Sequence, residues 1–411
     1  MLLLFKVVLL VALIVWPMAI ISAYQYGRLG RLLLRLDKKK TGTESDLPPL
    51  SIIIAAHNQA PALRRHLPVI LNQDYDRFEV IVIDMASTDE TKSVLERIEL
   101  QYANLRHTHT PASARDISIE RLALTLGFRS AANEWVVITH PDCEPISSLW
   151  LSRIGEAISA PKHFIQSPLL ASPEMVLGMA RYDEQRSSWL DYKTGFYRLW
   201  NTMATAQHVL NGHAAVRADA CNLAFRKSYF LEHGGFAEAQ DLKAGAEELL
   251  VNHTSTPYNT ALLLAPSAMV IQDRVSSEQT WAMQRLFYAE TRRHQHHAHL
   301  YRLEQSWRQL LPWLVAFALV LPLFVCCAFL FMEMEPIETR SIIILIVVLF
   351  LLIIIYTITK LISFNTTTRA LGCRSYYLSL LLLEFQLPLQ NLSARISRRF
   401  TSQNNFRKKF I

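Results

Sequence analysis

The segment between residues 50 and 89 constrains the fold of this 411-residue chain more than any other part. Its two apolar runs, Ser51–Ala55 and Phe78–Ile83, are short, rich in β-branched residues and not alternating, as is typical of parallel strands covered on both faces. Between them, Ala60–Gln73 carries apolar residues at helical spacing, namely Leu63, Leu67, Ile70 and Leu71. The segment therefore predicts a β-α-β unit of an α/β fold.

Polar residues stand where both predicted strands end. His57 and Asn58 follow the first strand, and Asp84 follows the second. Ligands of open α/β sheets bind outside the carboxyl ends of the strands. We therefore expect the binding site at this edge of the sheet.

The same residues resemble the family 2 glycosyltransferases of the GT-A fold. That family commonly ends its first strand in a P-A-Y-N-E-like turn, where this chain has Ala55-Ala56-His57-Asn58-Gln59. The family's V-D-D-G-S-T-D is Ile83-Asp84-Met85-Ala86-Ser87-Thr88-Asp89 here, and its D-x-D metal motif is His140-Pro141-Asp142. The segment Ser113–Trp150 around the D-x-D position is similar to the membrane-anchored bacterial members.

Three further motifs follow in the family's order. The family's N-x-A-[YF]-R turn, acidic base motif and Q-x-x-R-W-like motif correspond to Asn222–Lys227, Gly245–Leu249 and Glu290–His294. Together the matches cover roughly residues 50 to 300. The resemblance implies a GT-A domain with a mostly parallel sheet and flanking helices, joined to transmembrane helices. It also implies inverting transfer of a sugar from a nucleotide-diphosphate sugar.

The resemblance also implies which residues hold the substrates. The nucleotide-sugar site would comprise Ala55, His57, Asn58, Asp84, Arg121, Arg292, Arg293 and His294. The acceptor, a lipid-linked or polysaccharide glycan, would meet Asn222 and Arg226. An alternative for His57 is a plain surface turn histidine.

Asp142 and His140 are the candidate metal ligands. A divalent ion, Mn²⁺ or Mg²⁺, would stabilise the charge on the leaving diphosphate. Imidazole is a poor ligand for Mg²⁺ and an acceptable one for Mn²⁺. The alternative is a direct hydrogen bond from His140 to phosphate without metal. A histidine-rich stretch at residues 294–299 could also bind metal, but an amphipathic helix at a membrane would display such residues anyway.

Glu247 and Glu248 are the candidate catalytic bases, because a general base needs a carboxylate within reach of the acceptor hydroxyl. Two alternatives stay open. The pair could be an acidic helix start favoured by the helix dipole, or Ala246 could occupy the catalytic position. Substitutions at Met85, His140 and Glu290 and in the turn before Asn222 allow a second function, a degenerate homologue that serves as a scaffold with other glycan-assembly proteins.

Three segments are long and apolar enough to cross a bilayer: Leu2–Ile21, Leu310–Phe331 and Ile342–Ile362. A cleaved signal peptide is the alternative for the first. Basic residues follow it at Lys38–Lys40, and acidic residues Glu333, Glu335 and Glu338 separate the other two. The charge pattern predicts a multi-pass protein of the inner membrane with its catalytic domain on the cytoplasmic face.

The expected organisation has six parts. They are an anchor (1–24), a basic linker (25–47), the GT-A domain (48–275), amphipathic interfacial helices (276–307), two transmembrane helices (308–364), and an interfacial helix with a basic tail ending in Arg407, Lys408 and Lys409 (365–411). The net charge of +7 is concentrated beside the membrane segments, which favours anionic lipids over nucleic acid as partners. The five cysteines show no paired metal spacing and fit a reducing cytoplasm.

Overall fold

The computed structural model of this chain describes residues 2–36, 47–111, 118–159, 161, 167–185, 188–237, 245–330 and 336–400. Residues 37–46 of the predicted linker, the acidic residues Glu333 and Glu335, and the basic run Arg407–Lys409 lie outside the described residues. The chain divides into two compact units. The first comprises Met1–Leu32 with His299–Leu392, and the second comprises Leu33–Ala298 with Ser393–Ile411.

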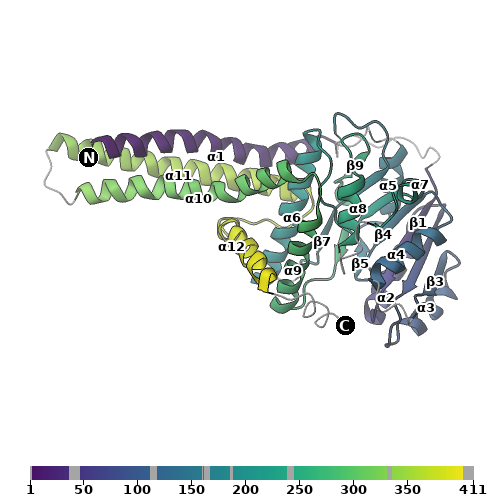
Figure 1. Cartoon of the computed structure of the whole chain (residues 1–411). Coiled ribbons are helices and arrows are strands. Elements are labelled where there is room, and N and C mark those ends of the chain that lie inside the picture. Colours follow the sequence, from purple (N-terminus) through teal and green to yellow (C-terminus); the bar gives the residue numbers. More distant parts are fainter. Residues whose placement is uncertain are drawn as a thin grey trace. The chain divides into compact units, whose positions relative to one another are not determined.

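A seven-stranded sheet lies at the centre of the second unit, in the order β3-β2-β1-β4-β8-β6-β9 (Figure 1). The strands are β1 (Leu50–Ala56), β2 (Phe78–Asp84), β3 (Leu105–His109), β4 (Trp135–Thr139), β6 (Met175–Gly178), β8 (Leu223–Arg226) and β9 (Thr260–Leu263). Strands β1 to β4 are parallel neighbours, whereas β8 runs antiparallel to both β4 and β6. The predicted α/β class with a mostly parallel sheet is confirmed.

Helices flank this sheet. They are α2 (Ala60–Leu71), α3 (Thr91–Glu99), α4 (Ile119–Ser130), α5 (Trp150–Ser159), α6 (Trp189–Leu210), α7 (Lys227–Glu232), α8 (Ala246–Thr254) and α9 (Glu278–His294). The predicted β-α-β unit is present as β1-α2-β2, with Ile52 of β1 opposite Val80 of β2. Helix α4 packs very closely on β1, since a Cβ added to Gly127 would lie 2.5 Å from Ile53 Cγ2.

A small second sheet follows the predicted metal motif. It pairs β5 (Cys143–Pro145) antiparallel with β10 (Val270–Gln272), which runs parallel to β7 (Ala180–Tyr182). The loop from His140 to Asp142 therefore joins the end of β4 in the large sheet to the start of the small one. This connection holds both predicted metal ligands between two sheets.

The described helices of the first unit are α1 (Leu2–Leu36), α10 (His299–Leu330), α11 (Pro336–Ala370) and α12 (Ser379–Phe400). The end of α1 after Leu32 and the end of α12 after Leu392 belong to the second unit. Helices α1, α10 and α11 lie side by side (Figure 1). The rings of Trp16 and Tyr356 meet edge to face with centroids 5.6 Å apart. A buried ion pair joins Lys360 of α11 to Glu384 of α12.

Two stretches of the described helices are long and apolar enough to cross a membrane, His299–Val325 and Ile346–Ala370. They overlap the second and third predicted spans. Helix α10 is continuous from His299 onward, so the expected border between interfacial and membrane helices at residue 308 falls inside one helix.

Candidate active site

Two cavities in the second unit share the side chains of Glu120, His140 and Glu247. The first, which we call the strand-end cavity, has a volume of about 230 Å³ and lies at the ends of β1, β2 and β4. Its remaining lining residues are Ala55, His57, Gln59, Met85, Leu124, Thr139, Pro141 and Asp142. Four residues that the sequence assigned to donor or metal binding, Ala55, His57, His140 and Asp142, thus meet at one place.

The second cavity, which we call the arginine-lined cavity, has a volume of about 310 Å³. Arg198 of α6 and Arg217, in the loop that follows α6, line it together with the first turn of α8. Gly245 starts that turn in a left-handed conformation, with φ +83°. A Cβ at this position would lie 2.6 Å from Thr291 Oγ1, so both the backbone angle and the close approach to α9 require glycine.

The turn after β1 is fixed by the turn after β2. His57 places Nδ1 2.8 Å from the carbonyl oxygen of Met85, which holds its ring at the cavity. Asn58 has φ +53° and accepts a hydrogen bond on Oδ1 from the backbone N–H of Thr88 at 2.8 Å. Asp84 accepts one from Ser87 N at 3.1 Å. Asn58 and Asp84, both predicted to bind the donor, support this turn and do not line the strand-end cavity.

His140 lies between the two cavities. Its Nδ1 is 3.7 Å from Cys221 Sγ, and its Nε2 is buried without a hydrogen-bond partner among the described residues. Asp142 Oδ2 accepts a hydrogen bond from Gln272 Nε2 at 3.0 Å. One imidazole nitrogen is therefore available to a ligand, while one carboxylate oxygen of Asp142 is held by the small sheet.

Burial and neighbouring charges shift the acid–base properties of this junction. Burial lowers the pKa of His140, but the opposite effect of Cys221, Asp142 and Glu247 is larger. The net pKa of His140 therefore lies well above its usual range. Burial and then the charge of Glu247 raise the pKa of Glu120 to about 7. A hydrogen bond from Cys143 and the nearby cations His140 and Arg198 lower the pKa of Cys221 to about 6. Groups at this junction can therefore exchange protons near neutral pH.

The two adjacent glutamates of α8 have different surroundings. Glu248 pairs with Arg217, whose Nε and Nη2 donate to its two carboxylate oxygens at 3.0 and 3.2 Å, and Gln295 Nε2 donates to it at 2.6 Å. Glu247 is only 3% exposed, lines both cavities, and accepts no hydrogen bond on its carboxylate from any described residue. Of the two predicted bases, Glu247 is the one with a carboxylate available for chemistry.

Arg198 contacts three other residues that line the arginine-lined cavity. Its Nε and Nη2 donate to the two carboxylate oxygens of Asp219 at 2.6 and 2.7 Å, and Nη2 also lies 3.1 Å from Cys221 Sγ. Its Nη1 donates to Gln272 Oε1 at 2.7 Å. Burial raises the pKa of Asp219, but Arg198 outweighs this and the net pKa is lowered. The guanidinium therefore links Asp219, Cys221 and, through Gln272, the Asp142 loop.

The two predicted acceptor residues lie away from both cavities. Asn222 is buried in the core, where its side-chain nitrogen donates to Met179 O at 2.9 Å and Ala268 O at 2.8 Å. Its oxygen accepts from Trp150 Nε1 at 3.1 Å. Arg226 pairs with Glu174 at 2.8 Å. Both residues therefore tie elements together, and neither lines the two cavities.

The predicted basic donor residues also lie outside these cavities. Arg292, Arg293 and His294 end α9, where Arg293 and His294 each lie 3.6 Å from Glu290. Glu290 also accepts a hydrogen bond from Arg398 Nε at 2.6 Å. Arg121 lines a separate cavity of about 330 Å³ together with Thr125, Arg129, Phe230, Leu231, Gly234, Gly235, Phe236 and Ala237. The structure does not bring these four residues to the strand ends.

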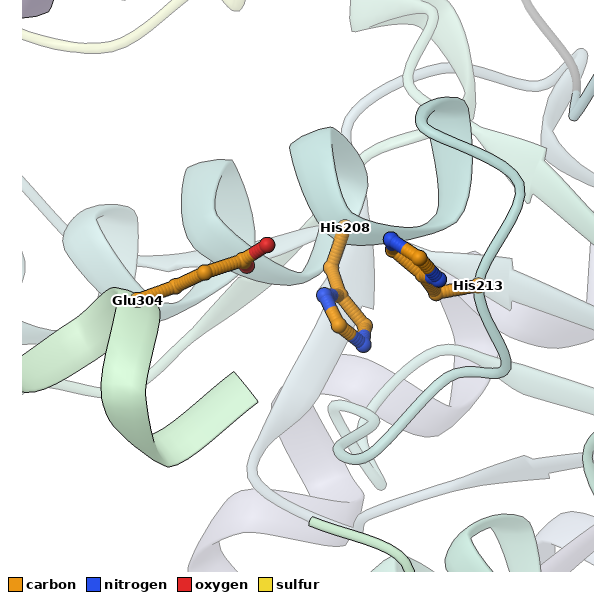
Figure 2. Close-up of side chains that lie close together, drawn as sticks. All are labelled: His208, His213 and Glu304. Carbon is orange, nitrogen blue, oxygen red and sulfur yellow. The ribbon is translucent and has the colours of Figure 1, made fainter. Parts of the chain in front are cut away.

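Among the described residues of the second unit, two further histidine pairs have ring centroids less than 5 Å apart. His208, in the last turn of α6, and His213 lie with ring centroids 4.6 Å apart (Figure 2). His253 and His296 have centroids 4.2 Å apart. None of these four lines either cavity. The histidine-rich stretch after α9 is therefore separate from the candidate active site.

Sequence reasoning missed Glu120, Arg198, Asp219 and Cys221 as members of the site. Glu120 lies in a helical segment with no motif of its own, and Arg198 lies in the middle of α6. The unusual turn at Ala218–Cys221 is the only signal that pointed here. It indicated an altered acceptor pocket without indicating which side chains form it.

Comparison with known proteins shows which family part of the second unit resembles. Residues 51–230 match the family model "Glycosyl transferase family 2". Glycosyltransferase AglE of Haloferax volcanii is 27% identical over 117 residues, which are 28% of this chain and 37% of that relative. Residues 51–230 include β1, β2 and β4, whose ends form the strand-end cavity.

A solved structure has a similar fold. The mannosyltransferase PcManGT from Pyrobaculum calidifontis, in complex with GDP-Man and Mn²⁺, superposes with a TM-score of 0.54 at 17% sequence identity and covers 96% of this chain and 100% of its own. Residues 51–230 therefore resemble glycosyltransferase family 2, and the chain shares the fold of this mannosyltransferase structure.

Proposed function

We propose that this protein is a membrane-bound glycosyltransferase that moves a sugar from a nucleotide-diphosphate sugar to a lipid-linked or glycan acceptor, with inversion at the anomeric carbon. One observation carries the proposal. The family 2 match lies on the strands whose carboxyl ends open into the strand-end cavity, where His57, His140, Asp142 and Glu247 converge. Ligands of open α/β sheets bind at this edge.

The strand-end cavity would hold the donor. The ring of His57, fixed against the Met85 carbonyl, offers a face for the base, and Ala55 leaves room beside it. His140 and Asp142 fit a divalent ion as one imidazole and one carboxylate on a single cavity wall, a set that suits Mn²⁺ better than Mg²⁺. When bound, such an ion would neutralise the leaving diphosphate. The raised pKa of His140 also allows its imidazolium to hydrogen-bond a phosphate directly.

Glu247 would take the proton of the attacking hydroxyl. Its carboxylate lies where the two cavities meet, so a donor in one and an acceptor in the other would place the hydroxyl beside it. Glu248 would keep the first turn of α8 in place through Arg217 and Gln295. The acceptor would then enter from the arginine-lined cavity.

A panel of nucleotide sugars tests this function. We expect the purified full chain in detergent to bind one class of nucleotide-diphosphate sugar and to release the free nucleotide in the presence of Mn²⁺. Calorimetry measures binding and a coupled nucleotide assay measures release. Donor binding without any turnover, on any acceptor tried, would favour the scaffold function, and failure to bind any nucleotide sugar would contradict both.

A further inference from the structure

Three side chains from different elements meet where the two cavities join. Glu120 lies in the first turn of α4, His140 directly follows β4, and Glu247 lies in the first turn of α8. Each offers one ligand atom, and these atoms all lie within 4.8 Å of one another. Atoms bound to one zinc-sized ion lie about 3 to 3.5 Å apart when the metal–ligand distances are about 2.0 to 2.2 Å. Side-chain movements of about an ångström would therefore bring the three ligand atoms to the spacing that one bound ion requires.

Two of the three groups lack the partners that buried polar groups normally have. Glu247 is 97% buried and accepts no hydrogen bond on its carboxylate within the described part of the chain, and His140 Nε2 is buried there without a partner. The neighbouring Glu248 has the opposite environment, with Arg217 and Gln295 filling both of its oxygens. The Glu247 carboxylate and His140 Nε2 thus lack partners, and together with the partly buried Glu120 they form a preassembled ligand set.

We infer that Glu120, His140 and Glu247 form a second cation site, selective for transition-metal ions such as Zn²⁺, whose occupation blocks sugar transfer. Imidazole together with carboxylates suits Zn²⁺ and similar ions and disfavours Mg²⁺ and Ca²⁺, which prefer oxygen ligands alone. An ion here would be neutralised by the two carboxylates.

The inhibitory consequence rests on the proposed function. An ion at this site would occupy the carboxylate that we assign as the base and would take His140 away from the donor's own cation. Zn²⁺ should therefore lower turnover even when Mn²⁺ is in excess. Its binding, in contrast, requires neither donor nor acceptor.

Zinc binding without nucleotide tests the site independently of activity. Calorimetry on the chelator-stripped full chain in detergent should show one tight Zn²⁺ per chain. Glu120→Gln and Glu247→Gln should each weaken this binding by at least about tenfold, since even residues that only support a metal ligand cost about 10- to 100-fold in affinity. Asp142→Asn is the control, because Asp142 is a candidate ligand of the donor's cation and no member of this set, and it should leave Zn²⁺ affinity within about twofold.

X-ray absorption spectroscopy of the wild-type chain, loaded with one equivalent of Zn²⁺, identifies the zinc ligands directly. This measurement needs no variant, so it also serves where a glutamate variant folds poorly. We expect one imidazole and otherwise oxygen ligands. A zinc–sulfur distance of about 2.3 Å would assign the ion to Cys221 and overturn the site. Unchanged Zn²⁺ affinity in both glutamate variants would overturn it as well. Lack of sugar transfer by the wild-type chain would count against the proposed function alone, because the binding result does not depend on it.

Discussion

At the scale of single residues, Glu247 and Glu248 are adjacent in sequence but have opposite environments. The sequence alone could not separate them, because the partners of Glu248 come from the loop after α6 and from the end of α9. Glu120 was missed for the same reason, since the first turns of α4 and α8 and the end of β4 bring it close to His140 and Glu247 only in the folded chain. Contacts of this kind depend on tertiary structure and leave no local pattern in the sequence.

Glu248→Gln should destabilise the fold. Removing the carboxylate leaves the half-buried Arg217 without its ion-pair partner, which costs roughly 3 kcal/mol in the free energy of unfolding when the pair is buried. Glu247→Gln should change this free energy by less than about 1 kcal/mol, because it also relieves repulsion with Glu120. Denaturant unfolding of both variants measures the difference, and equal stability losses would contradict the separate roles.

Cys221 should react with alkylating agents at unusually low pH. With a pKa of about 6, its thiol is already ionised at neutral pH, whereas an ordinary cysteine ionises near pH 8.5. Burial and Cys221 raise the pKa of Cys143, so this thiol should stay unreactive and serves as an internal control. Peptide mapping after iodoacetamide treatment across pH 5 to 9 reports both cysteines, and a Cys221 midpoint above pH 8 would contradict the assigned environment.

At the scale of elements, the sequence predicted β1, α2 and β2 because their apolar runs and helical spacing are strong local signals. The small sheet was not predicted, since β5, β7 and β10 have three residues each and pair across at least 90 positions of sequence. Asn222 was assigned to the acceptor by its motif. In the structure its partners Trp150, Met179 and Ala268 come from three distant segments and place it in the core.

The close packing of α4 on the sheet gives a prediction for Gly127. A methyl group there would lie 2.5 Å from Ile53 Cγ2 and 3.1 Å from Ile83 Cδ1, so Gly127→Ala should cost roughly 1 to 3 kcal/mol through overpacking. The loss should exceed the gain in helix propensity, which is about 1 kcal/mol. Thermal unfolding compares this variant with Ser130→Ala at an exposed position of the same helix. A higher Tm for Gly127→Ala would show that α4 does not approach β1 this closely.

At the scale of the whole molecule, the charge pattern of the sequence and two apolar helices support a membrane protein. The proposed topology places the sheet-containing unit in the cytoplasm and the short segment before α11 outside. In intact cells, a membrane-impermeant maleimide should therefore label Glu335→Cys and should label Ser93→Cys only after permeabilisation. The unsubstituted chain, with its five native cysteines, gives the background. The reverse labelling pattern would invert the topology.

The central claim is that Glu247 is the catalytic base. The most direct test compares the rate of sugar transfer by Glu247→Gln with that of the wild-type chain, using the donor that binds best. Because loss of a positioned general base costs about 10²- to 10⁴-fold in rate, we predict a fall of that size in turnover while donor affinity stays within about twofold. Turnover within about threefold of wild type would show that Glu247 is not the base and that the meeting point of the two cavities is not the reaction centre.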